Sequence, residues 1–103
     1  MTRLRMQVGL LPGTTDGAVA GVARAAARDE AVAASWEVLA MLDDCAERPA
    51  AYVHATAFCW GCCHDSTVSD EAAARAALEA FVTRLREAWL VGPKEPLYLE
   101  AES

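Results

Sequence analysis

The first ten residues alternate between apolar and polar side chains, which is the period of two expected for a strand with one buried face. The apolar positions are Leu4, Met6, Val8 and Leu10. The polar face of the same segment carries Arg3, Arg5 and Gln7. The dipeptide Pro12-Gly13 then predicts a turn, so we expect a half-buried strand over residues 3–10.

After this turn the pattern changes to a helical period that continues to about Glu47. Thr15 and Asp16 are suitable N-cap residues for its start. The apolar stripe formed by Val19, Val22 and Ala26 is out of phase with the later one, which predicts a break around residues 28–30. The second stripe contains Val32, Trp36, Val38, Leu39, Met41 and Leu42. Pro49 prevents the helix from continuing.

Residues 51–59 have the alternation of a second strand. One face carries Val53, Ala55, Ala57 and Cys59, and the other carries Tyr52, His54, Thr56 and Phe58. The glycine in Trp60-Gly61 predicts a turn at this point. Residues 63–68 that follow are compatible with a short return strand or with a loop.

The last third of the chain predicts a helix and a final strand. Ser69 is the expected N-cap, and Asp70 and Glu71 complement the helix dipole. The apolar stripe of this helix consists of Leu78, Phe81, Val82, Leu85, Ala88 and Trp89. Gly92-Pro93 ends the segment, and residues 95–100 alternate again as a strand.

The predicted order is β-α(α)-β-(β)-α-β in a single domain over residues 1–103. If residues 63–68 form a strand, the fold class is α/β of the α+β type, a ferredoxin-like sandwich. If they form a loop, a related open-faced sandwich remains. In both cases we expect a small, mostly antiparallel sheet with helices on one face.

Charge and apolar content narrow the possible partners and location. The chain has a net charge of −6, and its nine basic residues are scattered. Binding to nucleic acids and anionic membranes requires clustered basic residues, so we expect neither as a partner. The apolar run after Arg5 is short for a signal peptide, and we find no membrane span. We therefore expect a cytoplasmic protein with reduced cysteines.

The segment with the most reactive side chains is CWGCCH, from Cys59 to His64. Cys59 and Cys62 have the C-x-x-C spacing that suits a metal ion or a disulfide. Cys63 and His64 are adjacent ligands, and Cys45 is a further one from outside the segment. Zinc is therefore a possible cofactor, although a second ligand pair is missing. Metal binding, thiol redox chemistry and inert core packing all remain open.

The polar side of the predicted sheet is the second candidate site. We expect its residues to form an interface or the floor of a ligand site, because arginine and aromatic side chains are enriched at interfaces. They are Arg3, Arg5, Tyr52, His54, Thr56, Phe58 and Tyr98. Glu100 belongs to the same face.

No catalytic constellation is visible, which favours a non-enzymatic function. We expect a small binding or assembly protein, such as an accessory subunit, regulator or inhibitor. It would act through its sheet face or an acidic helical face, on a protein partner or in a homodimer. One alternative is a metal or thiol-redox protein that uses CWGCCH. Another is a small enzyme with a ligand pocket between sheet and helices.

Overall fold

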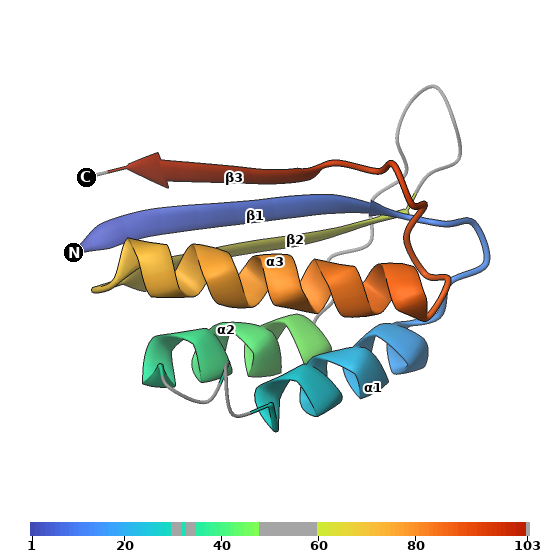
Figure 1. Cartoon of the computed structure of the whole chain (residues 1–103), viewed down its shortest axis with the longest axis horizontal. Coiled ribbons are helices and arrows are strands. Elements are labelled where there is room, and N and C mark those ends of the chain that lie inside the picture. The colour runs from blue at the N-terminus through green and yellow to red at the C-terminus, as the bar shows by residue number, and fades with distance from the viewer. Residues whose placement is uncertain (30–31, 33–34, 48–59, 103) are drawn as a thin grey trace.

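The computed structural model describes residues 1–29, 32, 35–47 and 60–102. They form a compact α+β unit with three helices and a three-stranded antiparallel sheet (Figure 1). The elements are β1 (Thr2–Leu10), α1 (Asp16–Ala27), α2 (Trp36–Glu47), β2 (Trp60–Val68), α3 (Glu71–Glu87) and β3 (Leu97–Glu102). This order confirms the predicted fold class. The strand predicted over residues 51–59 lies outside the described residues.

β1 is the central strand of the sheet, whose order is β2-β1-β3 with both pairs antiparallel. Val8 lies opposite both Cys62 of β2 and Leu97 of β3. All three helices cover the same face of this sheet, and the other face is left open by the described residues (Figure 1). The open-faced sandwich predicted from the alternation is therefore present.

The hydrophobic core lies between the sheet and the helices. The apolar residues of β1 point into it, and Leu4, Met6 and Val8 are completely buried. Because side chains alternate along a strand, Arg3 and Arg5 consequently lie on the open face. The helices contribute the apolar stripes, whose most deeply buried members include Val19, Val38, Met41, Leu42, Leu78, Phe81, Val82 and Leu85.

Two tryptophans that the apolar stripes predicted to be buried are exposed instead. Trp36 is the first residue of α2, and Trp89 follows the end of α3. Their side chains are 87% and 79% exposed, because each lies at a helix end beyond the part that packs on the sheet. Trp89 also has a left-handed backbone conformation, with φ of 60°.

The helix N-termini follow the predicted capping chemistry with one correction. Thr15 caps α1 by accepting a hydrogen bond from the Ala18 backbone N–H. The prediction that Ser69 caps α3 is wrong, because Asp70 has the extended cap conformation and accepts from the Ala73 N–H. Ser69 donates instead to the Glu37 carboxylate. Its hydroxyl therefore links α2 to the start of α3.

The predicted turn at Trp60-Gly61 is also wrong. Both residues belong to β2, where Gly61 lies opposite Gly9 and Trp60 opposite Leu10. β1 is nine residues long, and β2 pairs with it along that whole length. A continuous ladder satisfies every backbone donor and acceptor on this side, and this outweighs the local turn preference of glycine. Residues 63–68, for which a return strand and a loop were both open, belong to β2, which begins earlier at Trp60 and pairs with β1.

Candidate functional site

The open face is a continuous polar surface that runs across all three strands. The alternation that buries Cys62 and His64 places Cys63, Asp65 and Thr67 of β2 on this side. β1 contributes Arg3, Arg5 and Gln7, and β3 contributes Tyr98, Glu100 and Glu102. The Tyr98 side chain is exposed and gives the face its one large aromatic ring among the described residues.

Asp65 organises the two arginines of β1. Its carboxylate accepts from Arg3 Nε at 3.0 Å and from Arg3 Nη2 at 2.6 Å. The Arg5 guanidinium lies 3.6 Å away from the same carboxylate. The hydrogen bond from Arg3 lowers the pKa of Asp65, and Asp65 in turn raises the pKa of Arg3. These groups are exposed, so the pairs orient the guanidiniums and add little to stability.

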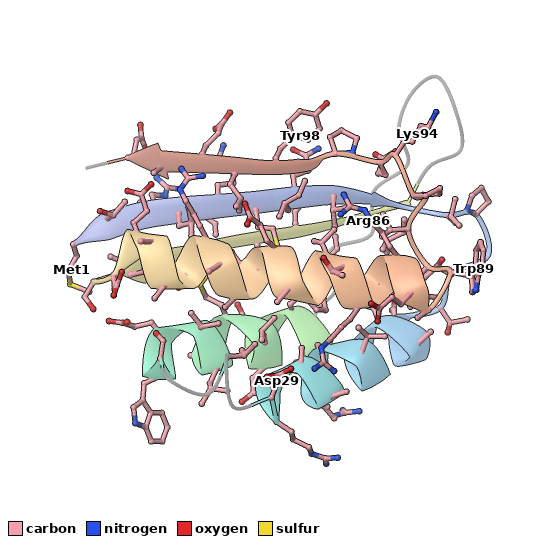
Figure 2. The ribbon with its side chains drawn as sticks, viewed as in Figure 1. Met1, Asp29, Arg86, Trp89, Lys94 and Tyr98 are labelled. Carbon is pink, nitrogen blue, oxygen red and sulfur yellow. The ribbon has the colours of Figure 1, made fainter. Side chains whose placement is uncertain are left out.

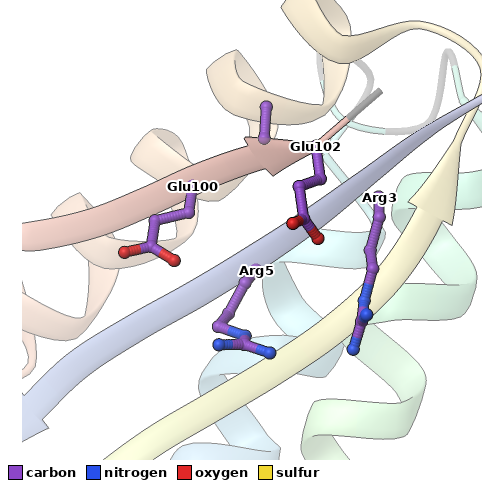
Figure 3. A pocket seen from close by; sticks show the side chains of 5 residues that line it. Arg3, Arg5, Glu100 and Glu102 are labelled. Atoms are coloured by element: carbon purple, nitrogen blue, oxygen red, sulfur yellow. The ribbon is translucent and has the colours of Figure 1, made fainter.

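Glu100 and Glu102 of β3 are left without an ion pair to the arginines. The register places Arg5 opposite Glu100 and Arg3 opposite Glu102. Both arginines nevertheless extend away from β3 and toward β2, as Figure 3 shows. An open hollow of about 550 Å³ lies between the two sets of side chains, lined by Arg3, Arg5, Glu100, Ala101 and Glu102. The face therefore has a positive row beside a negative row.

The role predicted for this face, an interface or the floor of a ligand site, stays a prediction, and the structure describes three of its seven residues. Arg3, Arg5 and Tyr98 lie on one side of the sheet. The other predicted members, Tyr52, His54, Thr56 and Phe58, lie outside the described residues. The alternative of a ligand pocket reaching Tyr52 or His54 lies outside them too.

The prediction missed Asp65 and Glu102. Extending the alternation of residues 63–68 would have placed Asp65 beside Cys63 on the polar side. The interpretation of that segment as a possible loop hid this signal.

The opposite, buried face of β2 brings Cys62 close to Cys45 of α2. The two Sγ atoms are 2.7 Å apart, and both side chains are almost fully buried as free thiols. The hydrogen bond with Cys45 and the burial both raise the pKa of Cys62. The same hydrogen bond lowers the pKa of Cys45 against the effect of burial. The hydrogen bond therefore acts in opposite directions on the two thiols.

His64 lies on the same face as Cys62 and faces the end of α2. Its Nδ1 atom is 3.5 Å from the Asp44 carboxylate, while Nε2 is buried and has no hydrogen-bond partner within the described part of the chain. Burial lowers the pKa of His64, with Asp44 acting in the opposite direction. Asp44 was not among the predicted site residues, because its position beside Asp43 resembled a solvated helix end.

The structure divides the CWGCCH segment between the two faces of the sheet. Cys62 and His64 face the helices, whereas Cys63 faces the open side. Cys59 lies outside the described residues. Within residues 1–29, 32, 35–47 and 60–102, no group of three or more His, Cys, Asp or Glu side chains is placed to hold a metal ion. Of the predicted set, Cys45 and Cys62 lie together and Cys63 lies on the opposite face, while the set as a whole, which includes Cys59, stays a prediction.

Comparison with known proteins returned no similarity, since no family model, no curated protein and no solved structure matches the chain. Among the described residues, none of the helices is long and apolar enough to cross a membrane.

Proposed function

We propose that the chain is a small assembly protein that binds a second copy of itself through the open face of its sheet. The observation that carries this proposal is the row of arginines on β1 beside a row of glutamates on β3 that form no ion pair with these arginines. Such a surface is complementary to itself. It suits an isologous dimer, in which the same patch is used on both subunits.

The strand register supports one particular symmetry. Arg5 and Glu100 are opposite each other, and so are Arg3 and Glu102. A two-fold axis that runs along the strands, midway between β1 and β3, exchanges the two rows. Each arginine of β1 is then opposite the partner's glutamate at the same height along the strand, and its guanidinium turns from Asp65 toward that glutamate in the dimer. Sheets pack about 10 Å apart, a gap that opposing Arg and Glu side chains can span together.

The size of the face predicts a dimer that dissociates readily. Three strands of nine, nine and six residues cover on the order of 400 Å². This is about half of the ~800 Å² per partner that stable interfaces bury. Complementary charges increase the specificity and the association rate of a complex more than they increase its affinity. We therefore expect a monomer–dimer equilibrium that depends on both concentration and salt.

Charge reversal tests this arrangement. Arg5→Glu places a carboxylate opposite the partner's Glu100, and Glu100→Arg places a guanidinium opposite the partner's Arg5. Only the weaker Arg3–Glu102 attraction at the strand ends then remains, so each variant alone is expected to be monomeric. An equimolar mixture restores both cross-subunit pairs and is expected to form a heterodimer. Sedimentation velocity over a concentration series measures all three samples, at low salt where exposed charges are least screened.

Matched reversals away from the face are the controls. Arg24→Glu on α1 and Glu79→Arg on α3 change the same charges on exposed helix positions, and should leave the dimer unchanged. The proposal is overturned if the native chain stays monomeric up to about 1 mM, which corresponds to about −4 kcal/mol of binding. It is also overturned if the mixture of the two face variants does not associate.

A further inference from the structure

The buried contact between α2 and β2 holds two thiols in a geometry that suits a covalent bond. Cys45 lies in the last turn of α2, and Cys62 lies on the helix-facing side of β2. Their Sγ atoms are 2.7 Å apart, whereas a disulfide bond is about 2.05 Å long. The sulfurs must therefore approach by less than about 1 Å for a bond to form.

A second contact between the same two elements lies next to the thiols. Asp44 precedes Cys45 in α2, and His64 is two residues beyond Cys62 in β2, so both pairs connect the end of α2 to β2. The end of α2 is therefore joined to β2 at two adjacent positions, and the two sulfurs have less than about 1 Å to travel.

We propose that Cys45 and Cys62 form a reversible disulfide by exchange with a low-molecular-weight disulfide such as oxidised glutathione. Both thiols are buried, so the contact between α2 and β2 opens locally before one protein thiolate attacks the external disulfide and releases the first small thiol. The second thiolate attacks the resulting mixed disulfide, forms the Cys45–Cys62 bond and releases the second small thiol. The two protons lost by the cysteines are taken up by the departing thiolates, and the external disulfide is the species reduced.

The disulfide would tie the helical layer to the sheet and stabilise the domain. Cys45 and Cys62 are separated by 17 positions in the chain. Closing a loop of this size in the unfolded state is expected to raise the Tm of a domain of about 100 residues by about 10 °C. The pair lies on the face opposite to the proposed dimer surface, so this inference does not depend on the proposed function.

The test uses a background with Cys59→Ser and Cys63→Ser, in which the two proposed partners are the only thiols. The folded protein is incubated with oxidised glutathione and its intact mass is measured. We expect the mass to fall by two hydrogen atoms and the Tm to rise by about 10 °C, reversibly on reduction. Adding Cys62→Ala leaves Cys45 alone, and this control cannot lose the two hydrogens.

A measurement on the native chain covers the case in which the background does not fold. A protease that cleaves after glutamate cuts at Glu47 and separates Cys45 from the other three cysteines. After the remaining thiols are alkylated, a peptide containing Cys45 is expected to be linked to Cys62. The inference is overturned if Cys45 is linked to Cys59 or Cys63. It is also overturned if the folded chain keeps both thiols under conditions that oxidise the unfolded chain, or if the bond lowers the Tm.

Discussion

Trp89 closes α3 in the left-handed backbone region, and this makes Trp89→Gly a stabilising substitution. The Trp89 N–H donates to the Arg86 carbonyl at 3.1 Å, and the Leu90 N–H donates to the Leu85 carbonyl at 2.9 Å. These are the two bonds of a Schellman motif, in which the left-handed position is usually glycine. Figure 2 shows the indole projecting away from the body of the domain.

The expected magnitude follows from two opposing backbone effects. A side chain with a Cβ pays about 1–2 kcal/mol for the left-handed conformation. Glycine avoids this cost but has about 0.5–1 kcal/mol more freedom to lose on folding. The indole is 79% exposed, so removing it sacrifices little packing. The net gain is about 0.5–1 kcal/mol, which corresponds to a rise in Tm of about 3–6 °C.

Circular dichroism melts and urea unfolding of three proteins measure this effect. The native chain is compared with Trp89→Gly and with Trp89→Ala, which also removes the indole but keeps a Cβ. We expect the alanine variant to lie within about 0.5 kcal/mol of the native chain, as for other exposed substitutions. If the glycine variant is no more stable than the alanine variant, the backbone argument is refuted and the indole itself must carry stability.

Three further predictions concern the core, the helix start and the buried histidine. Phe81 is completely buried, so Phe81→Ala should lower the free energy of unfolding, measured with urea, by about 3–5 kcal/mol. A loss below about 1 kcal/mol would contradict its place in the core. Asp70→Ala should lower the free energy of unfolding by about 1 kcal/mol because the α3 cap is lost, whereas Asp70→Asn keeps a capping oxygen and should change it little. Equal losses in the two variants would refute the capping role. Burial lowers the pKa of His64 in the folded chain below its ordinary value of 6.5. As the pH falls, the imidazole is therefore protonated in the unfolded chain before it is protonated in the folded one. The free energy of unfolding should consequently decrease as the pH drops below about 6.5 and through the folded pKa. His64→Gln should flatten this pH dependence, and an unchanged slope would assign it to other groups.

Much of the fold could be predicted because strand and helix periods are local properties of the chain. The alternation in residues 3–10 assigns both the buried and the open side of β1, since neighbouring side chains must point to opposite faces. The same reasoning correctly placed Arg3, Arg5 and Tyr98 together. It failed at Gly61, where a residue that favours turns lies inside a strand because the long β1 supplies hydrogen-bond partners along its whole length.

The candidate chemistry depended much more on tertiary structure. By itself, the sequence determined the order of elements, the apolar stripe of α3 and the concentration of thiols near Cys62. The packing of α2 on β2 decided that Cys62 meets Cys45, and the strand alternation in β2 decided that Cys63 lies on the opposite face. The strand order decided that Arg5 lies between Asp65 and Glu100. These pairings join residues far apart in the chain, and contacts of that kind are selected by the close packing of the whole domain rather than by any local pattern.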